Sequence, residues 1–428
     1  MIKRRIIQVL LIASLVFGPT AILSTPTLAM PNQAAGPTPT RQPSGPGSFT
    51  IDQTLSDNAQ RTTIAFSGLG FLTGTFASDS FFPPGKVADF WGFQYLRDND
   101  PSEMGHNTDF LTKAAFNMLN VLSSDQKAKL ITLAKSQVAS INQYGANRFV
   151  LITAFRRQLS GDIPAGKTAL SEAAVKSYSA TLYKLDGKIS YERAQVMGKI
   201  LYSLTSSQKA SLAALVGKGM VQWPTLQEPT ELRGLTHDEK VAVMTYAGDM
   251  FSWYAGSVKA DVYFCPERQG TYFGSFYLKD APAVGNPGYS IGTNITADLG
   301  NAFLATLNPT QAALITGLVS KQKPALLNIV TVRTKVSTEL RKFMAGKTAN
   351  SGTVQTLMDK YGQYDGTIVY NMAMAFSQVN KTLTPEQTAA LTTLRTDLLG
   401  NLSTPSQPYL YASPIPMPTV PNTDFLFK

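Results

Sequence analysis

Apolar residues recur at helical spacing along residues 122–161. Steps of three, four, seven or eight positions place these residues on one face of an α-helix, with polar positions between them. The residues of this face are Leu130, Ala134, Ile141, Tyr144, Ile152, Phe155 and Leu159. The pattern predicts one long amphipathic helix that stops at Gly161, because glycine readily takes the left-handed conformation found after a helix end.

The same pattern occurs a second time. Residues 307–346 align with residues 122–161 without a gap, and shorter matches precede and follow them, such as Asp186-Gly187 with Asp365-Gly366. No stretch shows the sustained apolar–polar alternation of a strand, and residues 70–74 are the most strand-like piece. We therefore predict an all-α fold of two tandem, duplicated helical bundle domains. Each contains one long helix, and the two can pack as a pseudo-dimer.

Five helix starts carry the same local signal, a capping box. A Ser, Thr or Asn side chain accepts a hydrogen bond from the backbone amide three residues on, and a Gln or Glu at that position reaches back. A leucine precedes each start, where it can pack against the first helical turn. The five tetrapeptides begin at Ser123, Thr205, Thr236, Asn308 and Thr384. They predict helices strongly and carry no chemistry of their own.

The first residues resemble a secretory signal. Lys3-Arg4-Arg5 precedes an apolar run from residue 6 to residue 23, and Thr27-Leu28-Ala29 is a suitable cleavage site. A retained membrane anchor is the alternative. The expected segments are a signal peptide (1–29), a Pro-rich tether (30–54), a first helical repeat domain (55–218), a linker (219–234), a second helical repeat domain (235–400) and a Pro-rich C-terminal tail (401–428).

Export also changes how the charge is read. The chain has 38 basic and 28 acidic residues, and cleavage after residue 29 would remove three basic ones, leaving a net charge of +7. This mild excess is spread along the helices, which favours acidic partners without indicating nucleic acid. Cys265 is the single cysteine, so no intrachain disulfide is possible. We expect the protein in the bacterial periplasm or outside the cell.

A polar line accompanies the apolar face of each long helix. Gln126, Gln137 and Arg148 are eleven residues apart, which returns each within about 20° of the same direction. Arg156 lies further along, and the second copy repeats the set as Gln311, Gln322, Arg333 and Arg341. In one interpretation the line is structural, with Arg148 paired to Asp98 or Asp186 and Arg333 paired to Asp280 or Asp365. In the other, the line forms a groove for anionic or amide ligands, because guanidinium groups bind such ligands as forks.

An aromatic cluster precedes each long helix and contributes Trp91 in the first copy and Phe273 in the second. Core packing and an exposed binding surface are both open for it. Met104 and His106 are weak candidates for metal ligands, since one histidine and one thioether do not complete a site. No nucleophile motif, phosphate loop or haem-attachment motif is present, so we expect neither an enzyme nor a cofactor.

The capping tetrapeptides also carry a family resemblance. Leu204-Thr-Ser-Ser-Gln208 and Leu383-Thr-Pro-Glu-Gln387 are similar to the Leu-Thr-x-x-Gln (LTxxQ) motif of the Spy-like family of periplasmic proteins. The resemblance implies an exported, basic, all-helical protein that acts as an ATP-independent chaperone or stress-sensing partner on a cradle-shaped surface. In this chain the motifs within a copy are spaced more widely than in that family.

Together these features predict an exported, non-enzymatic helical protein that holds polypeptide clients or a protein partner, without nucleic acid or a stable transmembrane anchor. The alternatives are a carrier or sensor for a small anionic or amide ligand, with a pocket in each bundle, and a structural cell-surface or assembly protein. The expected ligand-binding residues are Arg148, Arg156, Gln137, Trp91, Arg333, Arg341, Gln322 and Phe273.

Overall fold

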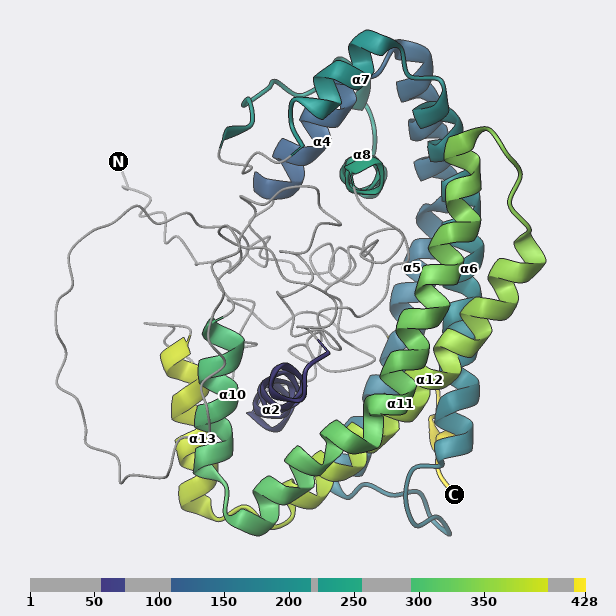
Figure 1. Ribbon diagram of the computed structural model, residues 1–428. Helices are drawn as coiled ribbons and strands as arrows, with labels where there is room; N and C mark the ends of the chain where they lie inside the picture. The colour runs from purple at the N-terminus through teal and green to yellow at the C-terminus, as the bar shows by residue number, and fades with distance from the viewer. Residues whose placement is uncertain (1–54, 74–108, 217–221, 256–293, 399–418) are drawn as a thin grey trace, which may run out of the picture.

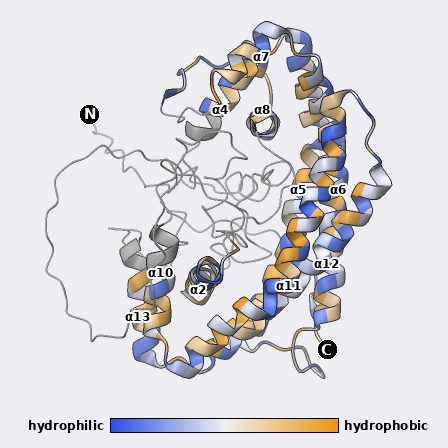
Figure 2. Ribbon diagram, in the orientation of Figure 1, coloured by the Kyte–Doolittle hydropathy of each residue, from blue (hydrophilic) through white to orange (hydrophobic). Residues whose placement is uncertain are grey.

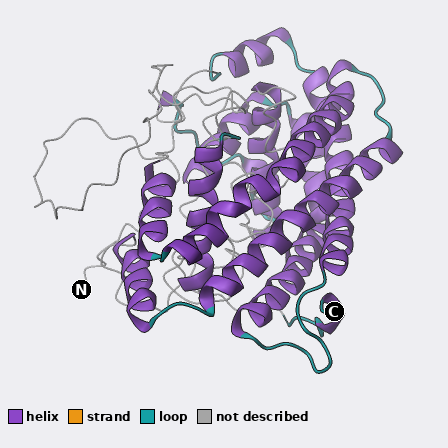
Figure 3. Cartoon of the chain, turned by 60° about the horizontal axis from the view of Figure 1, so that its bottom comes forward, coloured by secondary structure: helices purple, strands orange, loops and turns teal. Residues whose placement is uncertain are grey.

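The structure is a computed structural model that describes residues 55–73, 109–216, 222–255, 294–398 and 419–428. These residues form helices joined by short loops, and the described part contains no strand beyond a single bridge between Leu170 and Phe427 (Figure 3). The predicted all-α class is therefore confirmed. The helices are α2 (Asp57–Thr73), α4 (Asp109–Val121), α5 (Ser124–Ser160), α6 (Glu172–Tyr202), α7 (Ser206–Ala213), α8 (His237–Ala255), α10 (Asn294–Thr306), α11 (Pro309–Leu340), α12 (Ser351–Asn380) and α13 (Pro385–Leu398), with short 3-10 turns η3 (Thr230–Leu232), η5 (Arg341–Ala345) and η6 (Asp424–Leu426).

Local signals account for the ends of the long helices. The capping boxes at Ser123 and Asn308 are complete, so α5 and α11 begin where the sequence predicts. Helix α5 ends at Gly161, which has a φ of 80°. The second stretch differs at its end, because α11 tightens into η5 before Gly346, at a φ of 71°, closes it. Residues 70–73 of the strand-like stretch are helical, since they complete the buried end of α2.

The body of the molecule consists of the four long helices α5, α6, α11 and α12. Helices α4, α7 and α8 lie near one end of this body, and α2, α10 and α13 lie near the other (Figure 1). The most extensive contact between described helices joins α6 to α12. Gly187 of α6 faces Met358, whereas Gly366 of α12 faces Lys176, so the two helices run antiparallel. At Gly362 a Cβ atom would lie 2.5 Å from Cα of Ala180, so glycine lets the two backbones approach closely.

Two shorter helices connect parts of the chain that are far apart in sequence. Helix α2 packs on α10 and α11, and α8 packs on α4 and α5. The helices of the two expected domains therefore interleave, and one continuous hydrophobic core includes Ile64, Leu151, Val243 and Ile329. Apolar and polar residues are interspersed along the long helices (Figure 2), as expected for amphipathic helices.

Candidate functional site

The predicted polar line on α5 lies inside the helix packing. Gln137 and Arg148 are both buried. Nε2 of Gln137 donates to Oε2 of Glu192 at 2.8 Å and to the carbonyl of Ile189 at 3.3 Å. The amide oxygen of Gln137 accepts a hydrogen bond from the hydroxyl of Tyr246. Burial raises the pKa of Tyr246, so this hydroxyl remains protonated and able to donate. Gln137 thus ties α5 to α6 and α8.

The matching residues of α11 are buried too. Gln322 donates to Oε1 of Gln60 on α2 at 3.1 Å, and Arg333 lies within the packed face of α11. This burial agrees with the structural interpretation of the line, while the pairing of Arg148 and Arg333 with particular carboxylates stays a prediction. The carboxylates of Asp186 and Asp365 accept from Ser190 and Ser179, at 3.2 and 2.7 Å.

The two remaining arginines of the predicted site each stack on an aromatic ring. The guanidinium carbon of Arg156 lies 4.5 Å from the ring centre of Phe71 on α2. That of Arg341 lies 5.8 Å from the ring centre of Trp253 on α8. Cation–π contacts of this kind hold the ends of α2 and α8 against the long helices. Four further candidates, Trp91, Phe273, Met104 and His106, lie outside the described residues, as does Cys265.

A buried ion pair was not predicted from the sequence. Nη1 of Arg193 on α6 lies 2.8 Å from Oδ2 of Asp249 on α8, and both side chains are almost fully buried. The signal was present, because each residue interrupts an otherwise apolar helix face, yet nothing in the sequence relates the two positions. The sequence analysis considered Asp186 on α6 as a partner for Arg148 and did not consider Arg193 or Asp249.

The capping glutamines also pair with one another. Nε2 of Gln208 donates to Oε1 of Gln126 at 2.7 Å and to the carbonyl of Val121 at 2.8 Å. In the second half, Nε2 of Gln387 donates to Oε1 of Gln311 at 2.8 Å and to the carbonyl of Thr306 at 3.0 Å. The glutamines of the LTxxQ-like motifs therefore join two helix starts to each other and to the end of the preceding helix.

An open groove of about 850 Å³ runs between α2 and α11. Val319, Pro324 and Leu327 supply its apolar surface, and Leu327 is 47% exposed. Asp57, Arg61 and Lys323 line it with charge, and Lys323 Nζ lies 2.8 Å from Asp57 Oδ1. Large apolar side chains are seldom this exposed among the described residues, which makes the groove a candidate for binding an apolar segment.

Pro324 gives this groove a second property. It lies inside α11 and has no N–H, so the carbonyl of Ser320 has no amide four residues on from which to accept. Ser320 lines the same groove.

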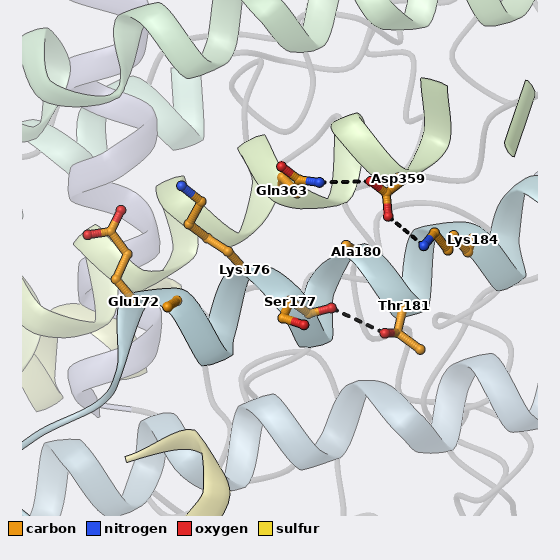
Figure 4. Close-up of a pocket in the computed structure, with 9 residues that line it drawn as sticks. Glu172, Lys176, Ser177, Ala180, Thr181, Lys184, Asp359 and Gln363 are labelled. Carbon is orange, nitrogen blue, oxygen red and sulfur yellow. Dashed lines mark hydrogen bonds and ion pairs between the residues drawn. The ribbon is translucent and has the colours of Figure 1, made fainter. Parts of the chain in front are cut away.

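A second groove, of about 690 Å³, lies between α6 and α12 and is more strongly charged (Figure 4). Nζ of Lys184 lies 2.8 Å from Oδ1 of Asp359, whose other oxygen accepts from Gln363 at 2.7 Å. Glu172 and Lys176 line the other end. Neither of these two grooves includes Arg148 or Arg333.

Three further findings bear on function. Within the described ranges, no three His, Cys, Asp or Glu side chains gather as a metal would require. None of the described helices combines the length and the apolar character of a membrane span. The chain matches no protein-family model, no curated protein and no solved structure.

Proposed function

We propose that the chain is an exported, non-enzymatic helical binding protein that holds extended polypeptide segments without a cofactor. The observation that carries this proposal is the groove between α2 and α11, where an apolar strip and charged side chains lie together beside Pro324, which removes the usual helical donor to the carbonyl of Ser320. The signal-like first residues and the resemblance to the Spy-like family support export and a chaperone-like role.

The three properties of the groove suit a polypeptide better than a small polar ligand. Val319 and Leu327 offer apolar contact to a client side chain. The carbonyl of Ser320 can accept from a client backbone amide, which is common to every sequence. Arg61 and Lys323 add positive charge, so an acidic or neutral segment is favoured over a basic one.

We further propose that the body is an internal duplication packed as a pseudo-dimer. Corresponding contacts support this on both sides. Helix α2 packs on α10 and α11 as α8 packs on α4 and α5. Arg156 stacks on Phe71 as Arg341 stacks on Trp253. In this proposal, the first helix of each copy packs mainly on the other copy, as in a domain-swapped dimer joined into one chain.

Light scattering from a chemically unfolded client tests the binding proposal. The client is diluted into buffer with and without residues 30–428, and we expect suppression near a stoichiometric ratio, weaker at high salt. Leu327→Ser should raise the ratio needed about fivefold, from the loss of about 1 kcal/mol of apolar contact. Tyr202→Ser is the matched control, because Tyr202 is 62% exposed and lies outside the groove. Absence of suppression by the unchanged protein would refute the proposal.

Pro324→Ala separates binding from stability. The alanine restores the amide hydrogen bond to Ser320, so α11 should become more stable while the carbonyl is withdrawn from clients. We expect a higher melting temperature together with weaker suppression. Equal or stronger suppression would show that the carbonyl plays no part in binding.

The charged groove between α6 and α12 favours the alternative, a carrier for a small anionic or amide ligand. Lys176 and Lys184 are the cationic residues that line it, and Lys184 is paired with Asp359. Native mass spectrometry of protein from its own host tests this alternative. A bound mass that is lost in Lys176→Ala, with the fold retained, would favour the carrier over the polypeptide holder.

A further inference from the structure

The last residues of the chain form a compact docked segment. Residues 423–428 lie against the end of α5, the loop 161–171 and the start of α6, and the segment includes η6. Leu426 and Phe427 are buried in the main core, whereas Phe425 is 54% exposed. Two adjacent side chains therefore anchor the segment in the core, while its backbone lies beside residues 168–171.

Backbone hydrogen bonds hold the segment in register. The amides of Thr168 and Ser171 donate to the carbonyls of Lys428 and Leu426, each at 2.7 Å, and the amide of Lys428 donates to the carbonyl of Ala169 at 2.9 Å. The loop is itself held in place, since Oε1 of the buried Gln158 accepts from the amide of Leu170 at 2.9 Å. The acceptor edge therefore has support from α5 as well as from the docked segment.

Side chains give the contact its selectivity. Nη1 of Arg157 donates to Oδ1 of Asp424 at 2.6 Å and to Oγ1 of Thr423 at 3.1 Å. The same guanidinium lies 5.2 Å from the ring centre of Phe427. The ring of Tyr178 contacts that of Phe425, with 5.8 Å between centres. The site therefore recognises an acidic residue followed by alternate aromatic and aliphatic side chains.

The linker between α13 and the docked segment is long enough for the segment to reach a second copy of the chain. Residues 399–422 separate α13 from the docked segment, and they include Pro405, Pro408, Pro414, Pro416, Pro418 and Pro421. A chain of this length can reach at most about 79 Å. Helix α13 and the C-terminus lie on opposite sides of the molecule (Figure 1), so the segment docks far from the helix that precedes it.

We propose that Arg157, the edge 168–171 and Tyr178 form an acceptor site for an acidic–aromatic peptide, and that the segment 423–428 of a second copy can occupy it in place of the chain's own. The same contacts form in either case, because only the linker distinguishes a segment of the same chain from that of a neighbour. This proposal is independent of the client-binding groove, which lies between α2 and α11.

Two full-chain variants test the exchange. The acceptor variant carries Leu426→Ala and Phe427→Ala, which weaken its own segment and leave the site intact. The donor variant carries Arg157→Gln, which weakens the site and leaves the segment intact. Mixed at about 50 μM, a concentration at which peptide contacts of micromolar affinity form, they should give a one-to-one complex in native mass spectrometry. Each variant alone should remain monomeric, and absence of the mixed complex would overturn exchange between copies.

A labelled peptide of residues 419–428 tests the site itself. We expect it to bind the acceptor variant at least tenfold more tightly than the unchanged chain, and an Asp424→Asn peptide to bind about tenfold more weakly, since one charged hydrogen bond is lost. No binding of the native peptide would overturn the proposal. If the acceptor variant does not fold, a protease site placed within residues 399–418 frees the native segment, which excess labelled peptide should then displace. Failure of displacement, or displacement by unrelated peptides alone, would equally overturn the proposal.

Discussion

Nε2 of Gln208 lies 2.7 Å from Oε1 of Gln126, a residue 82 positions earlier in the chain. Each of these glutamines completes the capping box of its own helix, so one hydrogen bond joins the starts of α7 and α5. Gln387 and Gln311 form the same contact at the starts of α13 and α11. The motif that resembles the Spy-like family therefore acts in this chain as a joint between helices.

Removal of Gln126 should destabilise the fold measurably. Gln126→Ala breaks a cap and the contact with Gln208, and we expect a loss of about 2 kcal/mol in the free energy of unfolding from urea titration. Gln143→Ala is the control, an exposed residue of the same helix, with an expected change within about 0.5 kcal/mol. In a double-mutant cycle, Gln126→Ala and Gln208→Ala should be coupled by about 1 kcal/mol. Strict additivity would show that the joint carries no energy of its own.

Removing one partner of the buried ion pair should destabilise the protein more than replacing both partners by apolar residues. Asp249→Ala leaves Arg193 buried without this carboxylate, and we expect a loss of about 3–5 kcal/mol in denaturant unfolding. The exposed pair of Asp57 and Lys323 is the comparison, where Asp57→Ala should cost less than about 1 kcal/mol. The double variant Arg193→Met, Asp249→Leu should lose less stability than Asp249→Ala alone. A larger loss would indicate that the pair contributes net stability.

The crossing of α6 and α12 should not tolerate a methyl group. In Gly362→Ala the new Cβ would lie 2.5 Å from Cα of Ala180 and 2.6 Å from the carbonyl oxygen of Ser179. Both neighbours are backbone atoms, so the helices must separate, and we expect a loss of about 3 kcal/mol. Gly317→Ala is the matched control within α11, since nothing lies within 4 Å of its new Cβ. Gly317→Ala should stabilise the chain by up to about 1 kcal/mol, because alanine has the higher helix propensity. Thermal melting of both variants measures the two effects.

Alkaline pH should weaken the protein through Tyr178. Burial raises the pKa of Tyr178 to about 12, from an ordinary value of 10.0. The unfolded chain therefore loses the phenol proton from about pH 10, while the folded chain keeps it until about pH 12. The contribution of this residue is complete below pH 10 and is lost as the pH rises towards 12. Urea unfolding at pH 9 and pH 11.5 should show a smaller decline for Tyr178→Phe than for the unchanged chain, and equal declines would contradict the assignment.

The sequence identified helices and their starts well, and positioned their partners poorly. All five capping boxes form as predicted, including those at Thr236 and Thr384. A capping box involves residues only three positions apart, so four consecutive residues are enough to predict it. By contrast, the sequence left open whether the polar line forms a groove or packs inside the fold. Helical periodicity shows which face of a helix a residue lies on, and it does not show which other helix packs against that face. Burial of Gln137 and Arg148 favours packing.

The grooves and the docked segment were beyond the reach of such patterns. Leu327 looks like any apolar residue of an amphipathic helix, and only the position of α2 leaves it exposed beside Arg61 and Lys323. Asp424 lies in a Pro-rich tail with no periodicity, and its contact with Arg157 spans 267 positions.

Short-range physics thus let the sequence alone determine the all-α class, the helix starts and the glycine stops, because caps and amphipathic periodicity are set within one or two turns. The tertiary structure alone decided which helices pack together. Gln60 meets Gln322 across 262 positions and Arg193 meets Asp249 across 56. Such contacts form only when several helices bury their apolar faces at once, and the best joint packing of those faces is a property of the whole chain.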